Sequence, residues 1–119
     1  MGIKRFETGS FLSQATAFGG LVWLSGMVTS GDPATQSVAE QATDTLAQIE
    51  ARLIAAGSDR SHMLFANIWL TDIGDWAPVN AAWMAWLDDV PPPARATVQS
   101  KLMPPYVVEI AVVAARKGP

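Results

Sequence analysis

One acidic residue lies in the most apolar stretch of the chain. Glu109 stands between Val107-Val108 and Ile110-Ala111-Val112-Val113, so both alternating faces of a strand here are apolar. A strand of this kind is covered on both sides, and an unpaired buried carboxylate is costly and raises its own pKa. Glu109 is therefore either a carboxylate satisfied by backbone amides or an arginine, or an acid/base group in a site.

Arg95 is the candidate partner, an isolated cation between Pro91-Pro92-Pro93-Ala94 and Ala96-Thr97-Val98. Its planar guanidinium matches a carboxylate, whether that of Glu109 or that of a ligand. If the last two strands form a hairpin, Arg95 and Glu109 share a face but lie about 13 Å apart at ~3.3 Å per residue. We expect them to share a site only through a ligand that spans them or through a neighbouring subunit.

Other polar residues have weaker claims to chemistry. Asn80 has apolar helical neighbours and is either a satisfied core amide or a ligand donor. Ser25-Gly26 ends a strand, where free backbone donors could receive an anion. His62 has no cysteine or second histidine to accompany it, so neither a metal site nor a catalytic triad is expected.

Composition excludes several classes of function. The 119 residues include no cysteine, and their eight basic and eleven acidic residues give a net charge of -3. Scattered basic residues offer no stripe for a phosphate backbone, so nucleic-acid binding is not expected. No apolar run approaches the ~18 residues of a membrane span, and we expect a cytoplasmic protein. The 16% charged share is below the roughly 25% typical of globular chains, which suggests surface hidden in an oligomer.

Hydrophobic periodicity and turn residues predict the elements that position these side chains. Ser37 and Glu40 have capping-box spacing at the start of a long amphipathic helix, and Gly57 is placed to end it. Asp75 can cap a second helix whose inner side carries several tryptophans, Trp76 included. The predicted elements are strands 3–7, 13–18, 21–25, 63–70, 96–101 and 107–115, and helices 38–56 and 76–90.

This order, β-β-β-α-β-α-β-β, indicates a single α+β domain over residues 1–119, with two helices on one face of a sheet. The Gly19-Gly20 pair suits the turn of a β-hairpin and not a phosphate loop.

Taken together, the motifs of the chain resemble those of the RidA/YjgF family, also called endoribonuclease L-PSP. Arg95-Ala96-Thr97-Val98-Gln99, followed by Leu102-Met103, is most similar to the YoaB-like branch. The motifs are Ser13-Gln14-Ala15, Leu24-Ser25-Gly26, Ala55-Ala56-Gly57-Ser58, Trp69-Leu70-Thr71-Asp72, Asp75-Trp76, Val79-Asn80, Pro93-Ala94-Arg95 and Val108-Glu109-Ile110.

The resemblance implies a chorismate-mutase-like fold with a mixed sheet, and a homotrimer with clefts between its subunits. It also implies hydrolysis of enamine and imine intermediates to a 2-oxoacid and ammonia, without metal or cofactor. Arg95 would hold the substrate carboxylate and Glu109 would activate water. The residues that would line the cleft are Ser25, Gly26, Asn80 and Thr97.

The chain departs from the family pattern at two positions. Leu12 stands where RidA proteins carry a tyrosine, and Thr97 stands where a cysteine is common. The leading hypothesis is a deaminase of small 2-imino acids. The alternative is a non-catalytic trimer that binds small carboxylates, and RNA cleavage ranks third because of the acidic charge balance.

Overall fold

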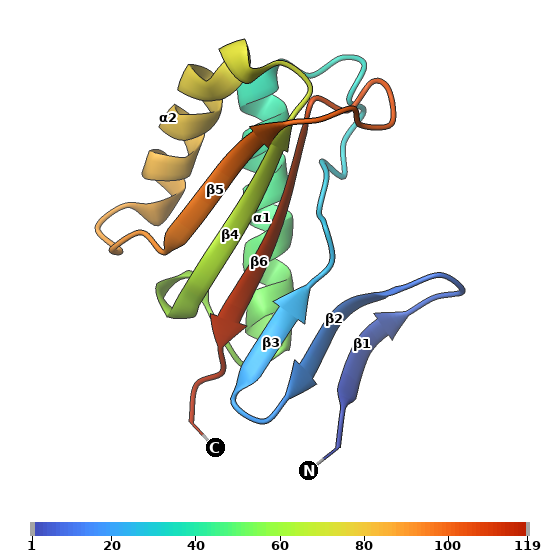
Figure 1. The fold of residues 1–119 in the computed structure, drawn as a ribbon, viewed down its shortest axis with the longest axis vertical. Helices are drawn as coiled ribbons and strands as arrows, with labels where there is room; N and C mark the ends of the chain where they lie inside the picture. Colours follow the sequence, from blue (N-terminus) through green and yellow to red (C-terminus); the bar gives the residue numbers. More distant parts are fainter. Residues whose placement is uncertain (1, 119) are drawn as a thin grey trace.

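The computed structural model describes residues 2–118 as one mixed sheet with two helices (Figure 1). The six strands lie side by side in the order β1-β2-β3-β6-β4-β5. Short 3₁₀ turns at Arg60–His62 and Ile73–Asp75 precede β4 and α2. The elements are β1 (Lys4–Thr8), β2 (Ser13–Phe18), β3 (Leu21–Leu24), α1 (Val38–Ala55), β4 (Met63–Leu70), α2 (Trp76–Leu87), β5 (Ala94–Gln99) and β6 (Val108–Ala115).

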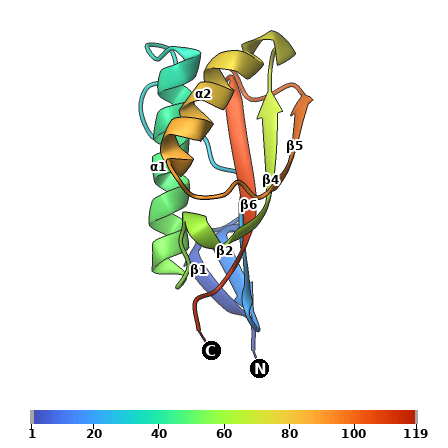
Figure 2. The same ribbon diagram turned by 90° about the vertical axis from the view of Figure 1, so that its left-hand side faces the viewer.

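Both helices cover the same face of the sheet, as the sequence predicts (Figure 2). The capping box at the start of α1 is present: Glu40 N–H donates to Ser37 Oγ, and Ser37 N–H donates to Glu40 Oε1. Gly57 follows the helix with φ of +82°, a backbone conformation that favours glycine. The α+β class and the two-helix layer are therefore confirmed.

The predicted hairpin of the last two strands is wrong. β6 pairs antiparallel with β3 on one side and β4 on the other, while β5 pairs parallel with β4 at the edge of the sheet. The reason is the β4-α2-β5 unit, because a helix that connects two strands returns the chain in the same direction. β4 therefore separates the two strands that carry Arg95 and Glu109.

The start of α2 also differs from the prediction. The helix follows Asp75, but the Asp75 side chain makes no capping hydrogen bond. Asp72 caps the preceding turn instead, accepting a bond from Gly74 N–H at 2.8 Å. Trp76, expected on the inner side, is 49% exposed, and burial along α2 begins one turn later at Val79.

Neither α1 nor α2 covers the second face of the sheet (Figure 2), and this face carries large apolar side chains. One row across it runs from Trp23 through Val113 to Phe65, and Trp69 pairs with Val98 in another. Of these, Trp23, Phe65 and Val98 are among the exposed large apolar residues. Within residues 2–118, neither helix combines the length and apolar character that a bilayer crossing requires.

Candidate functional site

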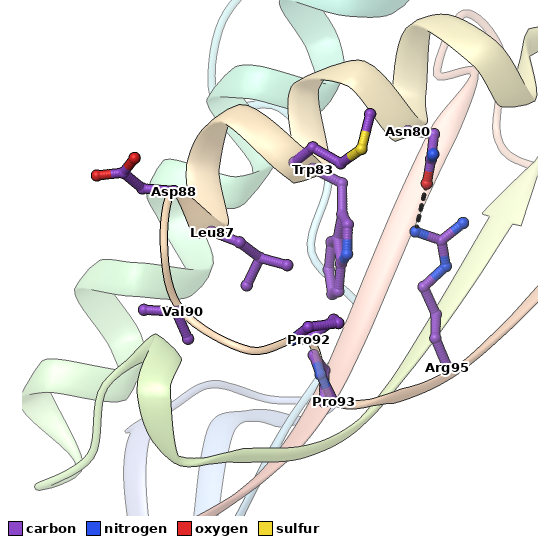
Figure 3. A pocket seen from close by; sticks show the side chains of 9 residues that line it. Asn80, Trp83, Leu87, Asp88, Val90, Pro92, Pro93 and Arg95 are labelled. Carbon is purple, nitrogen blue, oxygen red and sulfur yellow. Dashed lines mark hydrogen bonds between the residues drawn. The ribbon is translucent and has the colours of Figure 1, made fainter.

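Arg95 lies on the helix-covered side of the edge strand β5, facing α2. It pairs in register with Ala66, a fully buried residue of β4, and residues opposite one another in a sheet point to the same side. Its Nη1 donates to Asn80 Oδ1 at 2.9 Å (Figure 3), and its Nε donates to Thr97 Oγ1 at 3.1 Å. The guanidinium carbon stands 5.3 Å from the ring centroid of Trp83, a distance suited to cation–π attraction.

Asn80 and Thr97 accept hydrogen bonds from Arg95, so their own polar hydrogens remain available as donors. A guanidinium can only donate, so Asn80 must direct its oxygen toward Arg95 and its NH₂ group elsewhere. Thr97 likewise uses an oxygen lone pair, which leaves its hydroxyl hydrogen free. Neither group donates a side-chain hydrogen bond to any residue in the range 2–118. Together with Arg95 Nη2 they form a set of hydrogen-bond donors that an oxyanion would satisfy.

The charge of Arg95 is not balanced within the described part of the chain. Among residues 2–118 it takes part in no ion pair. Burial lowers the pKa of Arg95 from its usual value through desolvation, yet an arginine remains charged in proteins. A bound anion would restore part of the lost solvation.

A pocket of about 560 Å³ opens beside this cluster, between α2 and the segment that leads into β5 (Figure 3). Asn80 and Arg95 supply its polar end. The Trp83 ring stands between Arg95 on one side and Leu87 and Val90 on the other (Figure 3). The apolar residues that line the pocket are Trp83, Met84, Leu87, Val90, Pro92 and Pro93.

Glu109 belongs to a second cluster with Ser25 and Gly26. The 25–27 segment runs along β6, with hydrogen bonds in both directions between the backbones of Met27 and Ile110. A Cβ atom built on Gly26 would overlap Glu109 Oε2, so only glycine leaves the carboxylate its observed position. Ser25 Oγ donates to the carbonyl of Ser13 at 2.6 Å.

The Glu109 carboxylate is half-buried and lies on the uncovered face, not in the core as its apolar neighbours suggest. β6 buries Val108 and Ile110 against the helices, which turns Glu109 outward beside Trp69 of β4. Within residues 2–118 its carboxylate accepts no hydrogen bond and forms no ion pair.

The structure thus brings the predicted site residues together as two groups. Asn80, Arg95 and Thr97 lie on the helix side of the sheet, whereas Glu109 lies on the other side with Gly26 close by. Arg95 pairs with Ala66 of β4, and Glu109 pairs with Trp69 of β4. The backbones of Arg95 and Glu109 are therefore about 10 Å apart along the strand direction and two strand spacings of ~4.8 Å apart across the sheet. The expectation that both residues share a face is wrong, because it assumed the hairpin.

Sequence reasoning missed the role of Trp83, which it assigned to the core. Trp83 is buried, but its ring also supports the Arg95 guanidinium and walls the pocket. Its spacing from Asn80 and Leu87 was a usable signal, because residues three and four apart on a helix share a face.

His62 lies in a polar cluster with Asp59 and Ser61. Its Nδ1 is 2.7 Å from Asp59 Oδ1 and 3.0 Å from Ser61 Oγ, while Ser61 Oγ donates to Asp59 at 2.5 Å. A triad requires the serine and the carboxylate at different imidazole nitrogens. Among residues 2–118, no three His, Cys, Asp or Glu side chains are placed to hold a metal ion.

Comparison with known proteins places the chain in a family. The family model described as endoribonuclease L-PSP matches residues 2–116. A RutC family protein of Haemophilus influenzae is 37% identical over 115 residues, covering 96% of this chain and 98% of its own. The RutC family protein YoaB of Escherichia coli is 51% identical over 77 residues, covering 64% of this chain and 68% of its own.

A solved structure gives the same result. A YjgF family member from Neisseria meningitidis superposes with a TM-score of 0.93 at 41% identity, covering 100% of this chain and 98% of its own. Sequence motifs, strand order and relatives agree, and the chain belongs to the RidA/YjgF family.

Proposed function

We propose that the chain is a hydrolytic deaminase of small 2-imino acids that works in clefts between the subunits of a homotrimer. The observation that carries the proposal is the set of donors around Arg95, which lacks any anion within residues 2–118. A substrate carboxylate is the group that such a set binds best, through paired hydrogen bonds with the guanidinium.

The need for a second subunit follows from the positions of Arg95 and Glu109. They lie on opposite faces of one sheet, so no small substrate of one subunit can touch both. The uncovered face carries exposed Trp23, Phe65 and Val98, and an apolar surface of this kind marks an interface between proteins. Closed rings of identical subunits bury such faces and bring different parts of two copies together.

In this cleft Glu109 acts as the acid/base group. The substrate enters as its protonated imine, and the Glu109 carboxylate takes a proton from water as the water oxygen attacks the imine carbon. The C=N π electrons move to the positively charged nitrogen, which becomes the neutral amino group of the tetrahedral intermediate. Glu109 then returns its proton to the amino group of the tetrahedral intermediate. The C–N bond then breaks and ammonia leaves, while the ionised Glu109 takes the hydroxyl proton so that the carbonyl of the 2-oxoacid forms; Glu109 finally releases this proton to solvent. Arg95 holds the carboxylate throughout and fixes the imine carbon near the water.

Release of ammonia and 2-oxobutanoate from enzymatically generated 2-iminobutanoate tests this function. The wild type should exceed the spontaneous rate, and Arg95→Ala should fall to the rate in buffer. Arg5→Ala removes the same charge at an exposed position of β1 and should keep activity. Equal rates for the wild type, Arg95→Ala and buffer would contradict the proposal.

A second candidate is a trimer that binds small carboxylates without catalysis. It is favoured by Leu12, which is exposed in the β1–β2 loop at the position of the family tyrosine. Calorimetry with 2-oxoacids separates the two: binding that needs Arg95, without any ammonia release above buffer, supports this candidate. RNA cleavage that persists through purification and is lost in Arg95→Ala would instead support the endoribonuclease description of the family.

A further inference from the structure

We propose that the pocket beside Arg95 receives the side chain of the bound acid. The chain then favours 2-imino and 2-oxo acids with branched aliphatic or aromatic side chains over those with methyl or ethyl groups. This inference rests on the proposed function, because it takes the Arg95 cluster as the carboxylate site.

The size of the pocket is the first argument. Its volume of about 560 Å³ lies in the range of small-molecule sites, ~300–1,000 Å³. A methyl or ethyl group next to an Arg95-bound carboxylate leaves most of this volume to water. A larger apolar side chain displaces that water from Trp83, Leu87 and Val90 and gains the hydrophobic free energy of their contact.

The distribution of charge selects an apolar side chain over a polar one. Asn80 and Arg95 form the polar end of the pocket. Asp88 also lines the pocket, and its carboxylate points away from Leu87 and Trp83 (Figure 3). Beyond the Trp83 ring the walls are Leu87, Val90 and the two prolines. A polar or charged side chain would lose its water there and find no partner.

The walls are held in place by the fold. Trp83 and Leu87 are buried in α2, and proline rings fix the backbone at 92 and 93. Between them, residues 87–90 form a turn closed by Val90 N–H to Leu87 C=O at 3.0 Å. Asp88 takes φ 57° and ψ -116° in this turn, a conformation that favours glycine, and strain of this kind gathers at binding sites.

Binding of a series of 2-oxoacids tests the proposal by calorimetry on the purified wild type. Each buried methylene strengthens binding about fourfold. 4-Methyl-2-oxopentanoate has two side-chain carbons more than 2-oxobutanoate and should bind about sixteenfold more tightly. Phenylpyruvate should show a similar gain. Val90→Trp fills the pocket and should remove the gain. Ile54→Trp, at a 61% exposed position of α1, is the matched control and should keep it.

A second variant covers the case in which Val90→Trp fails to fold. Met84 lines the pocket yet is 58% exposed, so Met84→Gln should fold and reduce the gain severalfold, with Ile54→Gln as its control. Equal affinities across the series, or a gain that both pocket variants retain, would overturn the inference and leave the carboxylate site intact. Absence of binding for every 2-oxoacid would overturn the carboxylate site and this inference with it.

Discussion

Arg95 and Glu109 point to opposite faces of the same sheet, separated by β4. Arg95 is fixed on the helix side by Asn80 and Thr97, and Glu109 stands on the uncovered side over Gly26. A reaction that uses both groups must therefore use two copies of the chain.

Mixed assemblies of two variants test this consequence. Arg95→Ala should be inactive because it lacks the group that binds the substrate carboxylate. Glu109→Gln should be inactive because it lacks the general base. When the two are refolded together in equal amounts, half of the subunits carry each intact group. Random assembly then gives about one quarter of the clefts both groups, and activity should return to about that fraction of the wild type.

The control for this experiment mixes two variants from one cluster. Arg95 and Asn80 are hydrogen-bonded to each other in one subunit, so each cleft takes both side chains from the same copy. In a mixture of Arg95→Ala and Asn80→Ala every cleft lacks one of the two, and activity should stay low. If the Arg95→Ala and Glu109→Gln mixture also stays at the level of its parents, the two groups do not act together across an interface.

Gly26→Ala should impair catalysis without impairing the fold. The new Cβ would overlap the end of the Glu109 side chain, which can rotate away, so thermal unfolding should shift little. The displaced carboxylate should lower kcat by about tenfold or more, since acid/base catalysis contributes ~10²–10⁴-fold. Gly20→Ala meets no atom within 4 Å and is the control. Full activity in Gly26→Ala would show that the position of this carboxylate is unimportant.

Asp88→Gly should stabilise the protein. A residue with a Cβ is strained at φ 57° and ψ -116°, and glycine relieves a strain of about 1 kcal/mol. The melting temperature should rise by about 4 °C for a domain of this size. Asp89→Gly removes the same charge from the same turn at a residue without positive φ and should give no increase. An equal rise in both variants would assign the effect to charge instead.

Asp59 should contribute stability that disappears in acid. Hydrogen bonds from Ser61 and His62, with Lys117 nearby, hold the pKa of its carboxyl well below the usual range. Because the pKa is lowered in the folded state, the contribution is complete above the ordinary value of ~3.9 and is lost as pH falls below it. In urea unfolding, Asp59→Asn should be less stable than the wild type at pH 7, and the difference should shrink by pH 3.

The control for this pH dependence is Asp89→Asn, at an exposed carboxylate. It should follow the wild type at both pH values. A gap between the wild type and Asp59→Asn that is the same at pH 7 and pH 3 would refute the role given to the Asp59 carboxylate.

Local signals in the sequence were enough for most elements of the fold. Ser37 and Glu40 predict the start of α1, because a capping box depends only on two residues that are three positions apart. The strand predicted at 63–70 matches β4, and the Gly19-Gly20 turn joins β2 and β3 as predicted. These features depend on near neighbours in the chain, which a sequence displays directly.

Pairing between strands that are distant in the chain was harder to predict from the sequence. The order of the last two strands favours a hairpin, since sequential strands are usually neighbours, but β6 pairs between β3 and β4. The same error put Arg95 and Glu109 on one face of the sheet. The residues selected by the motif matches form two groups in the structure, and the register places Arg95 and Glu109 on opposite faces.

The position of β4 between the strands that carry Arg95 and Glu109 has a consequence for how such a protein behaves on dilution. One subunit contains both helices and the whole sheet, whereas in the proposed assembly it supplies only one half of each cleft. As the protein is diluted, its specific activity should therefore decrease, because assembly depends on concentration by mass action. The far-ultraviolet circular dichroism spectrum should stay the same, because folding of one subunit does not depend on concentration.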